Sequence, residues 1–531
     1  MAATAEALSF HDIWRPRANP WVIAFTVTLA TFMEALDSSI ANVAMQHIGS
    51  SLSSSTEEAT WVLTSYLVAN AVVLPISGWF ANRIGRKNFY MTCVVLFTLA
   101  SFCCGIAPTL GVLVFCRVLQ GAAGGGLQPS EQSILADTFP PEKRSMAFAV
   151  YGMAVVLAPA IGPTIGGWIV DNYSWRWLFF INIPVGMLSL YLTSRLVEDP
   201  PYVDEMRKRR QGIDYWGLGL LVVSIGALQV LLDKGQEDDW LSSRFITTLA
   251  VVSVAGLALF IWRELVVEHP VLDLRLFLKG NVGVTQLVTF MIGLSLYSTT
   301  VLVPQYLQEM MGYTAREAGM AISTGGLVLM LVFPIAGALA PRIDPRWQVA
   351  FGFIITALGL MRMTELNLSI SFGMAVSWRA FIALGLPFLF IPIGVLCYAG
   401  IPQEKYNDVS GMSALMRNLG GSVGISIMTT LLARLSQKHQ TMLLAHATSN
   451  DSNYVSLRNA LAGAWLSRGS GAWSDALHRA EAQIYGLAQQ QARLLAYVDV
   501  LWIMVALTVI LIPLPFLMKR PKPGAGSPIS H

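Results

Sequence analysis

The chain has 531 residues, of which 54% are hydrophobic and 13% are charged, and its mean hydropathy is +0.56. Soluble globular domains carry about 25% charged residues, so this composition excludes an ordinary soluble protein and predicts a polytopic membrane protein. The net charge of +3 indicates little until the basic residues are divided between the two sides of a membrane.

We expect no cleavable signal peptide. Residues 1–20 are polar and contain Arg15 and Arg17, and the apolar run that follows is longer than the core of a signal peptide. Apolar runs of membrane-spanning length then recur along the chain. The fourteen predicted spans lie at about 21–45, 59–81, 89–108, 110–136, 146–170, 177–197, 214–233, 245–265, 282–307, 317–340, 347–366, 379–401, 408–433 and 498–518.

The first span contains two acids, Glu34 and Asp37, which share one helix face because they are three residues apart. A carboxylate at bilayer depth costs about 2.5–3.5 kcal/mol, so such residues normally face a bundle interior or a water-filled cavity. A carboxyl that takes and loses a proton at this depth is what proton-coupled transport requires. The alternative is a carboxyl near the helix end that neighbouring polar side chains satisfy.

A basic loop joins the second and third spans. Its candidate gating residues are Gly78, Asn82, Arg83, Gly85, Arg86 and Lys87. A related pattern follows the tenth span at residues 337–346, again with Gly, an apolar residue, Ala, Arg-Ile and a second Arg. Repeated halves are typical of secondary transporters, so we predict two equivalent halves with spans seven and eight inserted between them. The loop either marks topology or latches onto the other half.

The fourth span contains Arg117, an arginine that stays charged inside the membrane and therefore needs a partner. The candidate partners are Asp37, Glu34 or helix-end carbonyls. If the partner is the proton carrier, the arginine favours its ionised form until the geometry changes. We therefore hypothesise that Arg117 regulates proton binding.

The fifth span is rich in glycine and proline. The residues that we single out are Gly152, Pro159, Gly162, Pro163, Gly166 and Gly167. The GxxxG pair at 162 and 166 allows a neighbouring helix to approach closely, and the prolines weaken the hydrogen-bond ladder of the helix. This pattern suits a hinge between two states, although close packing alone also accounts for part of it.

One sizeable segment, 434–497, lies outside the predicted membrane. Near-helical spacing of apolar residues predicts a helix over 474–495 that runs into the last span. The segment either covers the mouth of the bundle or presents a docking face to a partner.

The positive-inside rule predicts that both termini are cytoplasmic. The 35 Lys and Arg include clusters at 83–87, 207–210 and 519–522, which all fall on one side of the predicted membrane. The predicted organisation is a cytoplasmic N-terminus (1–20), a six-helix bundle (21–197), a basic cytoplasmic linker (198–213), two extra transmembrane helices (214–265), a cytoplasmic linker (266–281), a second six-helix bundle (282–518) that includes the outer, periplasmic loop 434–497, and a cytoplasmic tail (519–531).

Several classes of chemistry lack their motifs in this sequence. There is no GxxxxGK[ST], HExxH, CxxC or GxSxG, and the seven histidines show no metal-ligand spacing. We therefore expect no enzyme activity, cofactor, metal site or nucleic-acid partner, and we expect any uphill transport to use an ion gradient.

These motifs together resemble the major facilitator superfamily, and within it the fourteen-span drug:proton antiporters of the EmrB type. The matching stretches are residues 36–44, 78–87, 117–121, 162–167, 175–186, 304–308 and 312–313. The resemblance implies the major facilitator fold, in which alternating access exchanges lipophilic compounds for external protons. It also implies a bacterial inner-membrane protein that works with a periplasmic membrane fusion protein and an outer-membrane channel.

Two positions depart from the family pattern. The loop motif usually carries Asp where this chain has Asn82, so we expect Arg83 and Arg86 to act differently here. Glu34 adds a second acid beside Asp37, and we predict that it favours cationic substrates or shares the proton. Candidate residues of the substrate cavity are Asn42, Asn70, Gln128, Tyr297 and Gln305, which lie in predicted spans.

Two alternatives stay open. The first is an exporter of a dedicated metabolite, such as a siderophore or a fatty acid, with the same fold. The second, from a different class, is a membrane receptor or scaffold that transports nothing. Intramembrane Asp37 and Arg117 favour a transporter over a scaffold, because a scaffold has little use for buried charge.

Overall fold

A computed structural model describes residues 16–208, 214–268, 270–445, 447–448, 450–467 and 472–518. Every regular element in these ranges is a helix, as the composition and the spacing of apolar residues predict. Part of the basic linker, the Gly-Ser break at 468–471 and the predicted tail 519–531 lie outside the described residues.

The predicted first bundle contains six spans and two short helices. Its helices are α1 (Pro20–Val43), α2 (Met45–Ser51), α3 (Thr56–Ala59), α4 (Trp61–Ile84), α5 (Arg86–Ile106), α6 (Leu110–Gly124), α7 (Leu127–Thr138), α8 (Pro141–Asn172), α9 (Trp177–Phe180) and α10 (Asn182–Leu196). The fourth span is divided into α6 and α7 at Gly125-Gly126, because glycine weakens a helix at that point. The fifth span stays one helix, α8, with both prolines inside it.

The rest of the described chain supplies the other spans. Its helices are α11 (Pro201–Lys208), α12 (Tyr215–Lys234), η2 (Trp240–Ser242), α13 (Arg244–Val266), η3 (Leu274–Leu278), α14 (Val282–Glu309), α15 (Ala315–Leu339), α16 (Pro345–Met363), α17 (Phe372–Leu396), η4 (Gln403–Lys405), α18 (Tyr406–Leu444), α19 (Ser452–Ser467), α20 (Trp473–Ile510) and η5 (Leu514–Leu517). Among the described residues, thirteen helical segments are long and apolar enough to cross a membrane. The predicted span 347–366 corresponds to α16, which is not one of these thirteen and packs between α17 and α20.

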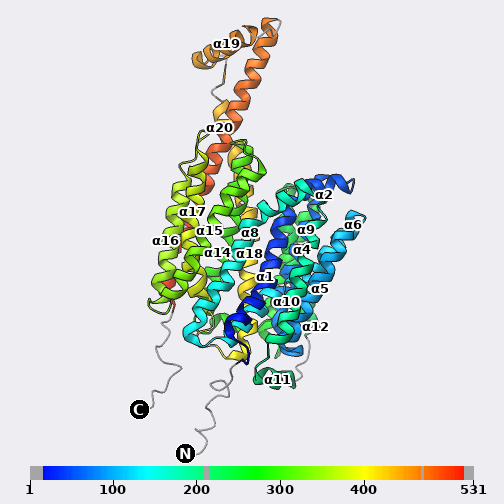
Figure 1. Ribbon diagram of the computed structural model, residues 1–531. Helices are drawn as coiled ribbons and strands as arrows, with labels where there is room; N and C mark the ends of the chain where they lie inside the picture. Colours follow the sequence, from blue (N-terminus) through cyan, green and yellow to red (C-terminus); the bar gives the residue numbers. More distant parts are fainter. Residues whose placement is uncertain are drawn as a thin grey trace, which may run out of the picture.

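The described chain starts and finishes at the same end of the bundle (Figure 1). Helix α1 rises from that end, and α20 returns to it and is followed by η5. Near the start of α1, the ring of Trp21 lies 4.9 Å from the ring of Phe139, which follows α7. Because the described chain enters and leaves the bundle at the same end, it crosses the membrane an even number of times.

The two copies of the loop pattern contact opposite halves of the molecule. Gly78 on α4 lies against Asn407 of α18, so closely that an added Cβ would be 3.1 Å from its carbonyl carbon. Gly337 on α15 lies against Ala149 of α8, 3.0 Å from an added Cβ. Each repeat glycine therefore brings the second helix of one half against a helix of the other half, which is the relation that the repeat predicts.

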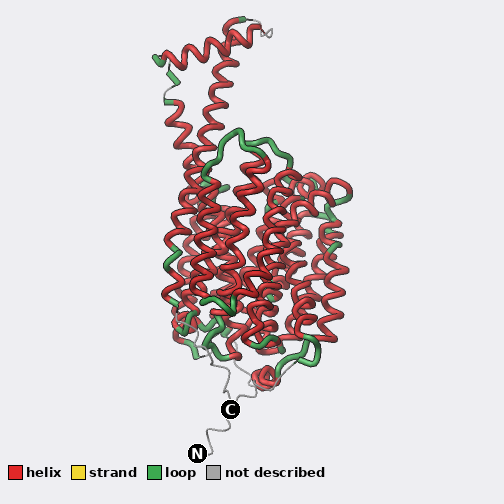
Figure 2. Tube along the Cα trace, turned by 60° about the vertical axis from the view of Figure 1, so that its left-hand side comes forward, coloured by secondary structure: helices red, strands yellow, loops and turns green. Residues whose placement is uncertain are grey.

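A helical hairpin stands out from the end of the bundle opposite the termini (Figures 1 and 2). Helix α18 has 39 residues, about 58 Å at 1.5 Å per residue, and therefore exceeds the roughly 30 Å of a hydrocarbon core. Helix α20 is continuous from Trp473 into the last span, so the predicted helix over 474–495 is confirmed. At the tip, Ala462 of α19 packs on Ala476 and Ala480 of α20. The segment projects away from the bundle and does not cover its mouth.

Candidate functional site

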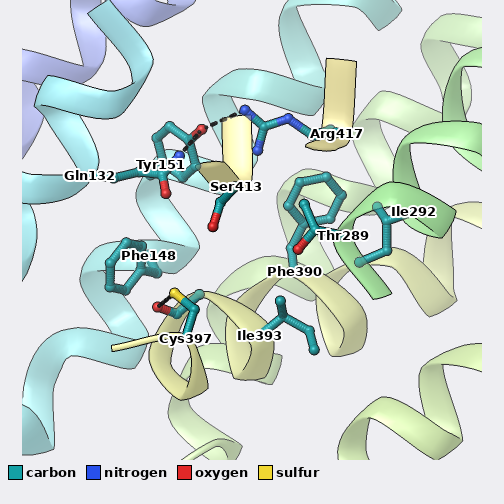
Figure 3. A pocket seen from close by; sticks show the side chains of 11 residues that line it. Gln132, Phe148, Tyr151, Thr289, Ile292, Phe390, Ile393, Cys397, Ser413 and Arg417 are labelled. Atoms are coloured by element: carbon teal, nitrogen blue, oxygen red, sulfur yellow. Dashed lines mark hydrogen bonds between the residues drawn. The ribbon is translucent and has the colours of Figure 1, made fainter. Parts of the chain in front are cut away.

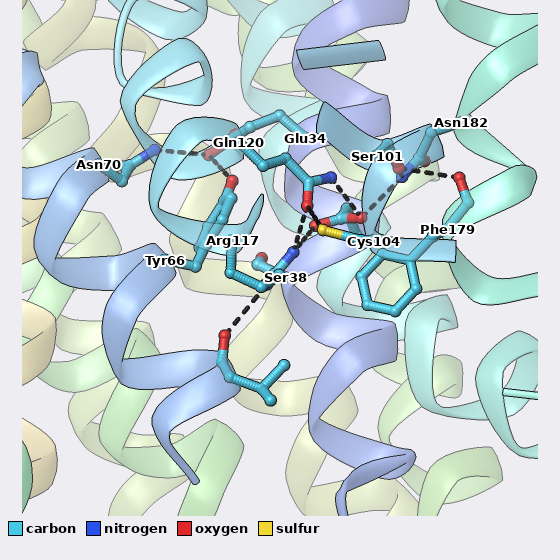
Figure 4. A network of polar contacts seen from close by, with 12 residues as sticks. Glu34, Ser38, Tyr66, Asn70, Ser101, Cys104, Arg117, Gln120, Phe179 and Asn182 are labelled. Carbon is cyan, nitrogen blue, oxygen red and sulfur yellow. Dashed lines mark hydrogen bonds and ion pairs between the residues drawn. The ribbon is translucent and has the colours of Figure 1, made fainter. Parts of the chain in front are cut away.

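Asp37 is buried and accepts from three side chains of a polar network between α1, α6 and α10, and Figure 4 labels these donors, Arg117, Gln120 and Asn182. Its Oδ2 accepts a 2.6 Å ion-pair contact from Arg117 Nη1. Its Oδ1 accepts hydrogen bonds from Gln120 Nε2 at 3.0 Å and from Asn182 Nδ2 at 2.6 Å. Three donors, one of them charged, therefore stabilise Asp37 as a carboxylate.

Arg117 is 0% exposed and is held from three sides. Its Nε donates to the carbonyl of Val62 at 3.0 Å, and its guanidinium carbon lies 4.2 Å from the centre of the Tyr66 ring. Gly121 makes this geometry possible, because a Cβ there would be 2.2 Å from the Tyr66 carbonyl oxygen. Of the partners predicted for Arg117, the structure pairs it with Asp37 and with a backbone carbonyl.

Glu34 occupies a second, separate polar site. Tyr66 Oη and Asn70 Nδ2 donate to its Oε1 at 3.1 and 3.2 Å, and Gln128 Nε2 donates to Oε2 at 2.8 Å. All three donors are neutral, and no Lys or Arg of the described chain forms an ion pair with Glu34. Glu34 therefore depends on hydrogen bonds alone, whereas Asp37 has a counter-ion.

Polar contacts continue from Glu34 into the second half of the molecule. Arg417 on α18 donates through Nη2 to Gln128 Oε1 and, at 3.0 Å, to Tyr151 Oη of α8. Asn418 Nδ2 donates to Asn70 Oδ1 at 3.2 Å. Two of the predicted cavity residues, Asn70 and Gln128, thus connect the acid of α1 to α18.

Of the other three predicted cavity residues, Asn42 and Gln305 lie near helix ends and Tyr297 lies in the bundle interior. Asn42 is exposed near the end of α1. Gln305 donates to Glu309 Oε1 at 3.2 Å near the end of α14. Tyr297 packs on α18, where a Cβ at Gly421 would be 2.5 Å from its ring. In the described structure no hydrogen bond joins any of the three to Glu34 or Asp37, but Tyr297 lies near enough to Arg417 and Glu34 to interact electrostatically with both.

A small cavity of about 30 Å³ lies between helices of the two halves (Figure 3). Its polar side chains come from Arg417, Gln132, Tyr151, Ser413 and Thr289, and its other lining residues are apolar or small. The apolar lining includes Phe148, Ile292, Phe390 and Ile393. The sequence analysis did not predict these lining residues. Arg417 could have been identified from the sequence, because this charged residue interrupts the apolar run of the thirteenth predicted span.

The basic loop forms a latch between α4, α5 and the start of α18. Arg86 is 1% exposed, forms an ion pair with Asp137 and donates through Nη2 to the carbonyl of Gln403 at 3.2 Å. Asn407 Nδ2 donates to Asn82 Oδ1 at 2.7 Å. We call these contacts, between Asn82 and Asn407 and from Arg86 to Asp137 and Gln403, the α4–α18 latch. Asn82, at the position where the family usually carries Asp, therefore accepts a hydrogen bond from the second half of the molecule.

The remaining loop residues contact neighbours in the first half of the molecule. Gly85 ends α4 with φ 93°, a conformation that glycine adopts without strain. Lys87 Nζ donates to the carbonyl of Ser194 at 2.9 Å. The guanidinium carbon of Arg83 lies 5.3 Å from the centre of the Trp79 ring. Arg83 and Arg86 thus contact different neighbours, and a role that differs from the family pattern stays a prediction.

Helix α8 packs against both α1 and α15. On the α1 side, an added Cβ at Gly162 would be 2.4 Å from Ser39 Oγ, and Ser39 Oγ donates to the carbonyl of Pro159 at 3.2 Å. On the α15 side, an added Cβ at Gly152 would be 2.6 Å from the ring of Phe333. The glycines therefore permit close packing on two faces.

The other small residues of α8 divide between contact and open space. Gly166 lies against Ile40, with 3.1 Å to an added Cβ, whereas Gly167 has no neighbour within 4 Å of such an atom. Pro163 lies inside the helix, and the adjacent Thr164 hydroxyl lies 3.0 Å from Ser323 of α15. The predicted close-approach pair at 162 and 166 thus packs on α1.

Comparisons with known proteins agree with this architecture. The sequence profile of the Major Facilitator Superfamily matches residues 27–425. The chain is 36% identical over 507 residues to the multidrug export protein EmrB of Escherichia coli (strain K12), covering 95% of this chain and 96% of that protein. It is 37% identical over 431 residues to the fatty acid resistance protein FarB of Neisseria gonorrhoeae, covering 81% and 84%. The solved structure of the proton:xylose symporter XylE is similar in fold, with a TM-score of 0.56 and 13% identity over 82% of this chain and 92% of that one.

Proposed function

Because the chain belongs to the Major Facilitator Superfamily, we propose that it is a proton-driven exporter of lipophilic and amphipathic compounds. The observation that carries this proposal is the buried ion pair between Asp37 and Arg117 inside the helical bundle. Buried charge at bilayer depth is costly and marks proton or ion pathways. The multidrug export function named for a relative of nearly the same length supports the export direction.

The proposed coupling step is protonation of Asp37. A proton on Asp37 neutralises the carboxylate that Arg117 contacts, so the ion pair is lost and the three helices that meet there are free to rearrange. Glu34 acts as an accessory acid. Loss of the proton restores the ion pair and the original arrangement, and the cycle continues by alternating access.

The α4–α18 latch supports an assignment of the state and of the two sides. Its contacts hold the two halves together at the end of the bundle where the basic loops gather. We take this end as cytoplasmic by the positive-inside rule. Substrate then enters from the cytoplasm or the inner leaflet after the latch opens, and the described arrangement is closed on that side. Both termini are cytoplasmic in this assignment.

The projecting hairpin suits a partner on the opposite side of the membrane. Its helices α18 and α20 extend beyond the bundle, and α19 lies at the tip (Figure 1). We propose that this hairpin contacts a periplasmic membrane fusion protein, which is joined to an outer-membrane channel. The protein then lies in the inner membrane of a Gram-negative bacterium.

A second candidate function is export of a dedicated amphipathic anion, such as a fatty acid. Arg417 is the one charged residue in the described lining of the cavity, beside polar, aromatic and aliphatic side chains, and FarB is a fatty acid resistance protein. Glu34 does not line this cavity, so the predicted preference for cations has less support than a preference for anions. A receptor or scaffold would not need the buried charges of this network.

The test is proton flux in everted membrane vesicles with a ΔpH-sensitive dye. Lipophilic cations, neutral compounds and weak acids are added one at a time, with Asp37→Asn as the matched control. Proton release that follows a substrate and disappears in the variant supports antiport. If no compound releases protons although the protein is present in the membrane, the proposal of proton-driven multidrug export is wrong.

A further inference from the structure

Glu131 on α7 is a buried acid that the proposed coupling site does not use. Its side chain is 0% exposed, and its Oε1 accepts a 2.6 Å hydrogen bond from Thr28 Oγ1 of α1. Within the described part of the chain, its Oε2 has no well-formed hydrogen bond, although the hydroxyl of Thr31 on α1 lies beside the carboxyl, and no Lys, Arg or His forms an ion pair with it. The sequence analysis missed it, although an acid inside a predicted span is the same signal that identified Glu34.

This environment suits a carboxyl that carries a proton. A carboxylate at bilayer depth costs about 2.5–3.5 kcal/mol, and the donors beside Glu131 in the described chain are two neutral hydroxyls, those of Thr28 and Thr31. A purely structural acid at this depth would be expected to have its lone pairs satisfied or its charge paired. Glu131 has neither, so the neutral acid avoids a cost that the anion must bear.

The position of Glu131 continues the line of acids along α1. Glu131 follows Gln128 by three residues on α7, so their side chains are neighbours with Cβ atoms about 5–6 Å apart. Gln128 in turn donates a hydrogen bond to Glu34. Thr28 precedes Glu34 by six residues, about 9 Å along the helix axis. Asp37, Glu34 and Glu131 therefore lie at three depths, and Glu131 is nearest the end that the α4–α18 latch closes.

Stabilisation of the anion decreases along this line. Asp37 accepts from an arginine and two amides, and Glu34 accepts from three neutral donors. Glu131 has two hydroxyls beside it, and only that of Thr28 makes a well-formed hydrogen bond. A proton that arrives at the Asp37 end therefore meets sites with progressively fewer donors for the anion as it moves towards the latch.

Four titratable or charged groups face Glu131 from the surrounding helices: Glu34 on α1, Tyr90 on α5, Tyr151 on α8 and Arg417 on α18. The Tyr90 hydroxyl donates to the carbonyl of Val27 at 2.7 Å, and Tyr151 accepts from Arg417. None of these groups makes a hydrogen bond to Glu131 that would stabilise its charge directly. Movement of α18 would change the distance between Glu131 and Arg417, the one cation in this set.

We propose that Glu131 is a third proton-binding site, which passes the proton between Glu34 and the latch end of the bundle. This inference rests on the proposed proton coupling. In the transfer, the O–H bond of the Glu34 carboxylic acid breaks and an O–H bond forms on the Glu131 carboxylate. The proton is the only species that moves, so the step needs no further reactant.

The test compares full-length wild-type protein with Glu131→Gln in two measurements. Glutamine keeps an oxygen that can accept the Thr28 hydrogen bond but cannot titrate, so a merely structural role predicts no change. Infrared difference spectra between acid and alkaline pH should lose one carboxylic-acid C=O band in the variant. Substrate-driven proton release in everted vesicles should fall by about tenfold, and Glu131→Asp should restore part of it.

Thr26→Val is the matched control, because the Thr26 hydroxyl is buried on α1 but bonds only to Val22 of the same helix. It should leave both the infrared bands and proton release unchanged. Glu131→Gln with every wild-type infrared band and wild-type proton release would overturn the inference. If wild-type protein itself shows no substrate-driven proton release, the proposed function fails, and the infrared band alone decides whether Glu131 exchanges a proton.

Discussion

The two halves of the molecule differ in the charges that they bury. The first half buries the acids Glu34, Asp37 and Glu131 together with two arginines, Arg117 and Arg86, which each pair with an aspartate. In the described part of the second half, from α14 to α20, the buried charged residues are Arg379 and Arg417, and no buried Asp or Glu accompanies them. The fold repeats between the halves, but the chemistry does not. We infer that the first half carries protons and that the second half supplies positive charge to the substrate and to the movement between states.

Asp37→Asn tests the first half and should have the largest effect. Loss of the titratable group should reduce substrate-driven proton release by about a hundredfold or more, in the range of other lost proton-transfer groups. The measurement is dye-reported proton flux in everted vesicles. Asp37→Glu, which keeps the charge and the proton site, should retain part of the flux.

The same variant leaves Arg117 buried without its counter-ion, which is expected to cost about 3–5 kcal/mol. The double variant Asp37→Asn with Arg117→Gln removes both charges and separates the two effects. It should recover thermal stability relative to Asp37→Asn but not proton flux, because the neutral pair cannot titrate. Recovery of flux in the double variant would show that Asp37 is not the proton carrier.

Arg417→Gln tests the contact between the halves and should have the next largest effect. Arg417 donates to Gln128 and to Tyr151 across the interface, and a hydrogen bond from a charged group contributes about 1.5–3 kcal/mol. The variant should shift the equilibrium between the two access states by about tenfold or more, towards the state with an open latch. Distances between spin labels on the two sides of the latch would report this shift.

Arg417→Lys is the matched control for charge, because lysine keeps the cation but lacks the fork of donors that bridges two partners. It should preserve the preference for anionic substrates and lose part of the conformational effect. An unchanged distance distribution in Arg417→Gln would contradict a role for Arg417 in holding the halves together.

Much of this organisation could be predicted from the sequence, and the misses have physical reasons. The helical spans follow from apolar runs, and Asp37 and Arg117 were identified because buried charge is rare. The choice of Asp37 over Glu34 as the partner of Arg117 depends on the packing of Gly121 against α4, which no spacing rule reveals. The cavity depends on residues from five helices, so Asn42 and Gln305 were chosen by span and lie away from it.

Glu34→Gln tests whether the second acid is needed, and we expect a smaller effect. Tyr66 and Asn70 can still donate to the amide oxygen of the new glutamine. Its NH2 group, however, then faces the NH2 group of Gln128, so two donors oppose each other. Proton flux should fall by about fivefold, and its dependence on pH should become weaker because one titrating group is lost. The measurement is flux across a series of pH values. An unchanged substrate range together with an unchanged pH profile would remove Glu34 from the mechanism.

Arg379→Leu should have the smallest effect, and it tests most directly whether the buried positive charge of the second half serves the substrate. Arg379 on α17 is 5% exposed and donates to Thr299 and Thr300 of α14 at 3.2 and 3.4 Å, with no carboxylate partner among the described residues. Replacing a buried charge by an apolar side chain is often neutral or stabilising, so thermal stability should be unchanged or higher. If positive charge in the second half serves anionic substrates, the apparent KM for a fatty acid should rise by about twofold to threefold, while that for a neutral compound stays the same. Equal effects on both substrates would instead assign Arg379 to helix packing, because a change in packing does not distinguish the charge of the cargo.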